Sequence, residues 1–121
     1  MQNRKQLLGR EGEQIAERYL REKGYKLLER NYRCPVGELD LIVLDRRTVV
    51  FVEVKTRAGY RFGNPLESVD RRKQKKIIGA ARFFLSQHRL HDRDARFDVV
   101  GISTMGREPL VDHIQNAFDL R

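Results

Sequence analysis

Residues 37–57 read Gly-Glu-Leu-Asp-Leu-Ile-Val-Leu-Asp-Arg-Arg-Thr-Val-Val-Phe-Val-Glu-Val-Lys-Thr-Arg, and this stretch decides the fold. Two apolar runs, Leu39 to Leu44 and Val49 to Val54, flank a polar turn at Asp45 to Thr48. This arrangement predicts a β-hairpin. Because both runs are apolar on both faces, we expect strands that are buried on both sides.

Charged residues interrupt these apolar strands, although buried charges are rare unless they are paired or hold a metal. A symmetric turn places Asp40 opposite Glu53, and side chains two residues apart share a face, so Lys55 points the same way as Glu53. Two carboxylates about 5 Å apart repel each other by roughly 3 kcal/mol at an effective dielectric constant near 20. One carboxylate is therefore protonated, or a cation lies between them.

The convergence of these charges has two interpretations. A site built from carboxylate oxygens suits Mg²⁺ or Mn²⁺, with the lysine beside the metal. Alternatively, the acids and the lysine form a buried ion cluster that only fixes the strand register. We favour the metal site, because perturbed ionisable groups that converge in an apolar sheet are typical of functional sites.

The composition limits the class of protein. A chain of 121 residues is expected to form one domain, spanning residues 1–121, with a single core. No apolar run approaches the roughly 20 residues of a membrane helix, and the first residues lead into no apolar signal segment. With Cys34 as the single cysteine, we expect a cytoplasmic protein and a structural role for this thiol.

The charge balance indicates a polyanionic partner. The formal net charge is +8 and the isoelectric point is about 10.1. Nucleic acid is the expected partner, since the chain has no helix that combines a strongly apolar face with basic flanks and Trp anchors for a membrane surface. Charge alone does not distinguish DNA from RNA.

The first helix is expected from Asn3 to Lys23, with Asn3 as the N-cap and Gly24 just after its end. Gly9 and Gly12 cost helix propensity at about 1 kcal/mol each relative to Ala, which a close approach to another segment would explain. Glu13 lies at the edge of the apolar stripe. It either reaches a site on the sheet or is a solvated surface residue.

A second helix is expected to begin at Asn64-Pro65 and to run to His88. Its first half is crowded with cations, which oppose the helix dipole and therefore suggest phosphate contacts. Lys73 falls within the apolar stripe, where an ammonium group must reach solvent or meet an anion. The cations in question are Arg71, Arg72, Lys73, Lys75 and Lys76.

The remaining segments are shorter. We expect strands at residues 25–32, 95–103 and 110–114, a loop at 31–37 and a polar tail at 115–121. The loop at 58–64 carries Tyr60 and Phe62, which either stack on a nucleotide strand or pack into the core. His88 and His91 have no third ligand nearby in the sequence, so a zinc site is not expected.

Several motifs together resemble a known family. They are Gly12-Glu13-x-x-Ala16-x-x-Tyr19-Leu20, Gly37-Glu38-Leu39-Asp40-Leu41-Ile42, Val50-Phe51-Val52-Glu53-Val54-Lys55-x-Arg57, Lys73-Gln74 and Arg96-Phe97-Asp98-Val99-Val100. The chain resembles the YraN-like family of small bacterial endonucleases. That family is similar in fold to Holliday junction resolvases and to the wider PD-(D/E)xK superfamily, although Leu39 stands where the superfamily has proline.

The resemblance implies an α/β fold of the restriction-endonuclease-like type, a mixed central sheet flanked by two main helices. It implies Mg²⁺ or Mn²⁺ bound by Asp40, Glu53 and the carbonyl of Val54. It places Lys55 near the attacking water and Glu13 as the acid that completes the site. The residues expected to bind nucleic acid are Arg57, Arg71, Arg72, Lys73, Gln74 and Lys76.

The expected function is metal-dependent hydrolysis of phosphodiester bonds in DNA, particularly branched or structured DNA. A homodimer would suit a cut in two strands. Two alternatives stay open: a non-catalytic nucleic-acid-binding protein of the same fold, and a scaffold that binds a protein through its charged helix. The first alternative predicts salt-dependent binding without cleavage, and the second predicts binding that survives nuclease treatment.

Overall fold

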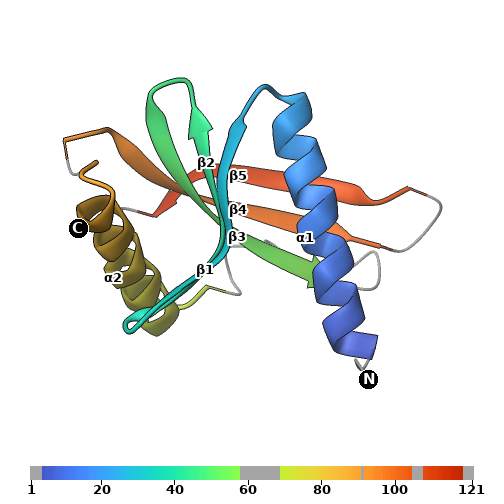
Figure 1. Ribbon diagram of the computed structural model, residues 1–121. Helices are drawn as coiled ribbons and strands as arrows, with labels where there is room; N and C mark the ends of the chain where they lie inside the picture. Colours follow the sequence, from blue (N-terminus) through green and yellow to red (C-terminus); the bar gives the residue numbers. More distant parts are fainter. Residues whose placement is uncertain (1–3, 58–68, 91, 105–107, 119–121) are drawn as a thin grey trace.

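The computed structural model describes residues 4–57, 69–90, 92–104 and 108–118. Its elements are α1 (Arg4–Glu22), β1 (Lys26–Cys34), β2 (Gly37–Asp45), β3 (Thr48–Arg57), α2 (Arg71–Gln87), β4 (Ala95–Ser103) and β5 (Leu110–Phe118). The strands form one sheet in the order β1-β2-β3-β4-β5, as Figure 1 shows. Only β3 and β4 run parallel, so the sheet is mixed. The expected fold class, a mixed central sheet flanked by two helices, is confirmed.

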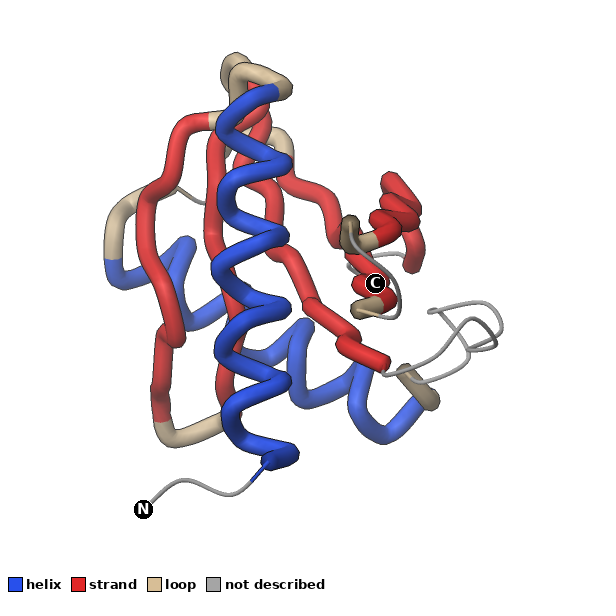
Figure 2. Tube along the Cα trace, turned by 90° about the vertical axis from the view of Figure 1, so that its right-hand side faces the viewer, coloured by secondary structure: helices blue, strands red, loops and turns tan. Residues whose placement is uncertain are grey.

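The two helices cover opposite faces of the sheet (Figures 1 and 2). Along β3, Val50 and Val52 pack into the core beneath α1, whereas Val49 and Phe51 pack into the core beneath α2. The strand is thus buried on both faces, as its apolar run predicts. Because side chains alternate between the faces, every odd-numbered residue of β3, including Glu53, is directed toward α2.

The central hairpin has the predicted register. Asp45 pairs with Thr48, and the antiparallel ladder continues to the pair Leu41 and Val52. Beyond that pair, β2 remains bonded to β1 through residues 37–39 but no longer pairs with β3. The two central strands therefore part just before Asp40 and Glu53, so the predicted pairing of these two residues across the hairpin is wrong.

Two strands are longer than the sequence indicates. β1 continues to Cys34, so the predicted loop at 31–37 is wrong and only residues 35–36 form the turn. Cys34 pairs with Gly37, and Arg33 forms an ion pair with Glu38 at 3.2 Å. β5 likewise continues to 118, where the ring of Phe118 stacks on that of Phe97 at 4.7 Å. These contacts with the neighbouring strands explain why both strands are longer than predicted. The predicted strand at 95–103 is confirmed.

The start of the second helix also differs from the prediction. α2 begins at Arg71, because the carboxylate of Asp70 accepts a hydrogen bond from the backbone N–H of Lys73 at 2.8 Å. Val69 and Asp70 are not helical, so a continuous helix over residues 65–88 is wrong. The other predicted features at 58–68, Asn3 and His91 lie outside the described residues. The first helix ends as expected, with Gly24 at φ +96°.

Candidate functional site

Asp40 enters the gap that opens between β2 and β3. Its Oδ2 accepts a hydrogen bond from the backbone N–H of Val54 at 2.8 Å, in place of the strand partner that β2 no longer provides. In a β-strand the N–H and C=O of one residue point to the same side. The Val54 carbonyl therefore faces the same gap as the Asp40 carboxylate.

Glu53 lies beside this gap on the α2 face of β3, with 7% of its surface exposed. Its Oε1 is 2.8 Å from the ammonium of Lys73 and 3.7 Å from that of Lys55. The contact with Lys55 agrees with the shared face predicted from the sequence. The shorter contact, with Lys73 on α2, is one that the sequence did not reveal.

These groups line one cavity of about 300 Å³, which we call the acid site. Its lining consists of Gly9, Glu13, Asp40, Glu53, Val54, Lys55, Thr56 and Lys73. Glu13 reaches it from α1, and its charge contributes to raising the pKa of Asp40. The structure therefore brings together all the residues predicted to be catalytic, namely Glu13, Asp40, Glu53 and Lys55.

Close packing of α1 on β3 explains how Glu13 reaches the sheet. A Cβ atom added at Gly12 would lie 2.9 Å from the Cβ of Thr56, closer than such atoms approach each other. Only glycine permits this contact, which brings the helix close to the last residues of β3. Gly9 has no atom within 4 Å of an added Cβ, so only Gly12 is explained by a close approach.

The acid site shifts the protonation of its groups. Removal from solvent, followed by the nearby charge of Glu53, raises the pKa of Asp40 to about 7, against the hydrogen bond from Val54. Burial and the charge of Glu53 also raise the pKa of Glu13. Burial lowers the pKa of Lys55, and the neighbouring Lys73 lowers it further. Burial disfavours charged Lys73 too, but its hydrogen bond to Glu53 and the negative charges of Glu53 and Asp40 together raise the pKa of Lys73.

The donor set of the acid site fits a divalent metal of the Mg²⁺ class. Asp40 and Glu53 supply carboxylate oxygens, and the Val54 carbonyl adds a backbone oxygen. The Lys73 ammonium on Glu53 is a stand-in cation, which demonstrates room for positive charge at that oxygen. Within the described ranges, no group of three or more His, Cys, Asp or Glu side chains is already arranged to hold a metal.

The residues predicted to bind nucleic acid lie at the end of β3 and on the first turns of α2, and Lys73 alone among them lines the acid site. Arg71, Arg72 and Lys76 are exposed on the first turns of α2. Arg57 ends β3, and its carbonyl accepts a hydrogen bond from the backbone of Thr104 at 3.1 Å. Gln74 is differently placed, because its amide donates to the carbonyl of Val69 at 2.9 Å and supports the start of α2.

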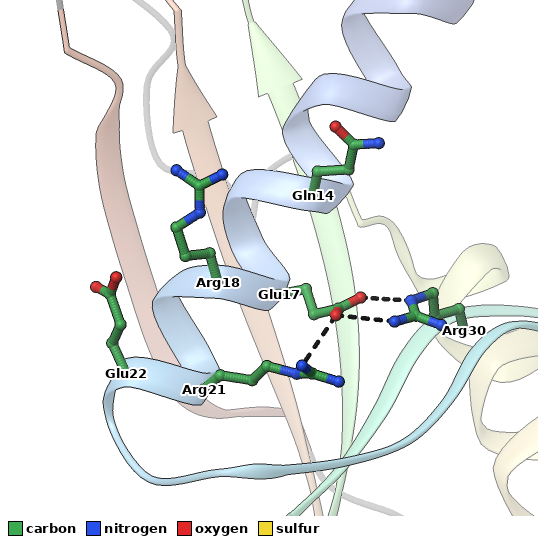
Figure 3. A pocket seen from close by; sticks show the side chains of 6 residues that line it. All are labelled: Gln14, Glu17, Arg18, Arg21, Glu22 and Arg30. Atoms are coloured by element: carbon green, nitrogen blue, oxygen red, sulfur yellow. Dashed lines mark hydrogen bonds and ion pairs between the residues drawn. The ribbon is translucent and has the colours of Figure 1, made fainter.

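A larger hollow of about 670 Å³ lies along the outer side of α1 and shares no residue with the acid site. Figure 3 shows Glu17 at its centre, bound to Arg30 at 2.6 Å and to Arg21 at 3.4 Å. Arg18 and Glu22 point away from this cluster (Figure 3). The glutamate is already neutralised by two guanidinium groups, so we read this cluster as a link between α1 and β1.

Comparison with solved structures finds a distant likeness. The chain aligns with the structure of Pyrococcus furiosus SfsA in complex with Ca²⁺ at a TM-score of 0.42 and 14% sequence identity. The alignment covers 92% of this chain and 63% of the SfsA chain. No helix among the described residues is long and apolar enough to cross a membrane.

Sequence comparison gives much stronger matches. The model of the family described as "Uncharacterised protein family UPF0102" matches residues 12–102. A UPF0102 protein of Syntrophotalea carbinolica is 48% identical over 113 residues, covering 93% of this chain and 92% of the relative. A UPF0102 protein of Chlorobium phaeobacteroides is 50% identical over 117 residues, covering 92% and 93% respectively. The chain therefore belongs to the UPF0102 family, the YraN-like family that its motifs resemble.

Proposed function

We propose that this protein is a Mg²⁺- or Mn²⁺-dependent endonuclease that hydrolyses phosphodiester bonds in DNA, with branched or structured DNA as the preferred class. The observation that carries the proposal is the convergence of Asp40, Glu53 and Lys55 in one cavity where β2 parts from β3. The net charge of +8 supports a polyanionic substrate.

Each residue of the acid site has a role in this proposal. Asp40, Glu53 and the Val54 carbonyl would hold the metal, which supplies Lewis-acid stabilisation of the phosphoryl oxygens when bound. Lys55 orients the attacking water and, with its lowered pKa, takes a proton from it at Nζ. Glu13 would complete the acidic lining of the site from α1, beside Asp40.

The basic residues on the first turns of α2 would contact the phosphates on either side of the scissile bond. Arg71, Arg72 and Lys76 project from the first turns of α2, close in sequence to Lys73 at the acid site. Such contacts position the substrate without reading its sequence. We therefore expect the shape of the DNA, more than its base sequence, to determine which substrates are cut.

The test is a titration of Mg²⁺ and Mn²⁺ against linear, flapped and four-way DNA. Glu53→Gln and Asp40→Asn should each reduce cleavage at least about 100-fold. Glu53→Gln should keep or tighten DNA binding, since it removes a negative charge that faces the substrate. Glu38→Gln is the matched control, because Glu38 lies on the same strand as Asp40 with its side chain 66% exposed.

Three results would count against the proposal: cleavage that persists in EDTA, equal loss of binding and cleavage in Glu53→Gln, or a comparable loss in Glu38→Gln. Each would mean that cleavage does not depend on the acid site in the way proposed. Cleavage confined to wild type and Glu38→Gln, and dependent on the divalent metal, would support it.

A second candidate is a non-catalytic nucleic-acid-binding protein. The observation that favours it is the exposed basic cluster of Arg71, Arg72 and Lys76, which needs no metal in order to bind phosphates. This candidate predicts salt-dependent binding that is unchanged by EDTA and no cleavage of any DNA in the panel. The same titration therefore decides between the two functions.

A further inference from the structure

One buried carboxylate, Glu53, is shared by two lysines of different origin. Lys73 comes from α2 and holds Oε1 at 2.8 Å, whereas Lys55 comes from β3 itself and lies at 3.7 Å. The Glu53 side chain is 9% exposed, so its charge has little contact with water. A buried carboxylate needs a cationic partner, and the geometry makes Lys73 the main one.

Lys73 is built so that its ammonium can leave without disturbing the fold. Its backbone N–H is fixed by the Asp70 cap at 2.8 Å, so the helix start does not depend on the ammonium. Its side chain is 40% exposed, against 20% for Lys55. When its ammonium is released from Glu53, so long a side chain can turn outward to solvent or to an anion.

The position of Lys73 conflicts with that of a metal. A divalent cation coordinated by Asp40 and Glu53 would lie close to an ammonium that contacts the same carboxylate. Like charges about 4 Å apart repel strongly in a partly buried site. A bound metal would also balance the negative charge of Glu53, as Lys73 does in its absence. The lysine is then no longer needed there.

We propose that Lys73 is the resident cation of the acid site, and that a divalent metal displaces its ammonium from Glu53 and frees it to bind a phosphate of the substrate. This inference rests on the proposed function, because it requires that the acid site bind a metal. It makes Lys73 a positioning residue with two alternative anionic partners. It also couples phosphate binding to metal occupancy, so the metal-loaded protein gains a substrate contact that the metal-free protein lacks.

The first test compares thermal unfolding of Lys73→Met and wild type, with and without saturating Mn²⁺. In EDTA, Lys73→Met leaves Glu53 without its nearest cation, and its Tm should fall by roughly 4–8 °C. At saturating Mn²⁺ this difference should close, because the lysine no longer contacts Glu53 in wild type. Lys75→Met, which removes an exposed cation of the same helix, should change Tm little under either condition.

The second test measures Mn²⁺ binding by calorimetry. Lys73→Met removes the competing cation and should lower the Kd for Mn²⁺ about tenfold. Lys73→Arg keeps the charge, and therefore the fold, but a guanidinium holds a carboxylate through two hydrogen bonds. It should raise the Kd several-fold. Lys75→Met should stay within about twofold of wild type.

The third test follows the freed ammonium to the substrate. Binding of four-way DNA is measured over a range of salt concentrations, in Ca²⁺ and in EDTA. In Ca²⁺ the slope of log K against log salt should be about 0.9 shallower for Lys73→Met than for wild type, the value for one lost phosphate contact. In EDTA the two slopes should agree, because Lys73 is then held by Glu53.

The outcomes separate this inference from the proposed function. If wild type binds Mn²⁺ but the Tm difference persists at saturation, Lys73 stays on Glu53 and the displacement is wrong, while the metal site stands. Equal slope differences in Ca²⁺ and EDTA would also overturn it. If wild type binds no Mn²⁺, both proposals fall. Should Lys73→Met not fold, the direction of the Kd change in Lys73→Arg decides.

Discussion

Asp40 shows how one missing strand pairing creates an unusual carboxyl group. In a continued ladder, the Val54 N–H would bond to the backbone of β2, but here it bonds to the Asp40 side chain at 2.8 Å. The carboxyl is thereby drawn between two strands and away from water. Burial and Glu53 raise its pKa to about 7 despite the Val54 hydrogen bond.

This pKa predicts how the stability of the metal-free protein depends on pH. The pKa of Asp40 is higher in the folded protein than in the unfolded chain, so the folded state binds the proton more tightly. The stabilisation is fully present below about pH 4 and is lost as the pH rises through about 7, with a size on the order of a few kcal/mol. Urea unfolding at pH 4.5 and pH 7.5 in EDTA measures it.

The Asp40→Asn variant provides the comparison. It cannot titrate at this position, so the free energy of unfolding should fall less between the two pH values than it does in wild type. Glu38→Gln should keep the wild-type pH dependence. An identical pH dependence in wild type and Asp40→Asn would show that Asp40 does not carry a raised pKa.

At the residue scale, the sequence revealed the acids but not their closest cation. Hairpin register indicated Asp40, Glu53 and Lys55, because strand side chains alternate and opposed positions are fixed by the turn. The structure brings Asp40 and Glu53 to one cavity without the predicted pairing, because the ladder ends at Leu41 and Val52. The contact between Lys73 and Glu53 depends on how α2 docks on the sheet. No local pattern predicts how α2 docks. The lysine within an apolar stripe indicated only that its ammonium reaches solvent or meets an anion.

At the scale of elements, α1 packs closely on β3 at a helix position that has no side chain, Gly12. An added Cβ at Gly12 would lie 2.9 Å from the Thr56 Cβ, and both positions are fixed by backbone. Thr56 directly follows Lys55, so this contact also sets the depth at which α1 presents Glu13 to the acid site.

Alanine substitutions at the two glycines of α1 should therefore have opposite effects. Gly12→Ala should lower the free energy of unfolding by about 1–3 kcal/mol, the usual cost of overpacking. Gly9→Ala has open space around the new methyl group and should raise it by up to about 1 kcal/mol through helix propensity. Urea unfolding of both variants measures the difference. Equal effects would mean that α1 does not approach β3 closely at Gly12.

Element boundaries were predictable where local signals dominate and not where distant contacts do. The hairpin register and the strand at 95–103 follow from apolar runs with clear turns at their ends. Pro35 and Gly37 looked like a long loop, but pairing of Cys34 with Gly37 reduces it to a two-residue turn. The strong cap signal at Asn64-Pro65 concealed Asp70, which is the actual cap of α2.

At the scale of the whole molecule, a second buried carboxylate joins segments from both ends of the chain. Asp98 is fully buried and accepts hydrogen bonds from Arg96 at 3.0 Å and from the backbone of Asn116 at 3.0 Å. His113 lies 2.8 Å from it, and its other ring nitrogen is 3.3 Å from Lys23, which can only donate. His113 therefore connects Lys23, just after α1, to the buried Asp98.

Loss of this carboxylate should affect the fold more than the chemistry. Asp98→Ala removes a carboxylate that binds the Arg96 guanidinium. The variant should lower the free energy of unfolding by about 3 kcal/mol or more. Asp98 shares a face of the sheet with Val100, beneath α1, whereas Glu53 faces α2. Urea unfolding of Asp98→Ala beside Asp112→Ala, an exposed carboxylate on β5, checks this.

The overall architecture was accessible from the sequence because both helices and the central strands β2, β3 and β4 carry clear apolar patterns. Arg96 and Asp98 are two residues apart on β4 and therefore share a face, and they form an ion pair at 3.0 Å. The contact of Asp98 with Asn116 was not predictable, since it depends on β5 running past Ile114, and that with His113 depends on how β5 pairs with β4. A long edge strand without a dense apolar run leaves little trace in the sequence.

The early separation of β2 from β3 has one more consequence. Most amide protons of a central strand are held by a neighbouring backbone, but that of Val54 is held by an ionisable carboxylate. Its NMR resonance and its exchange with deuterated water should therefore respond to whatever Asp40 binds, proton or metal. A single backbone signal can thus serve as a built-in sensor of the chemistry next to it.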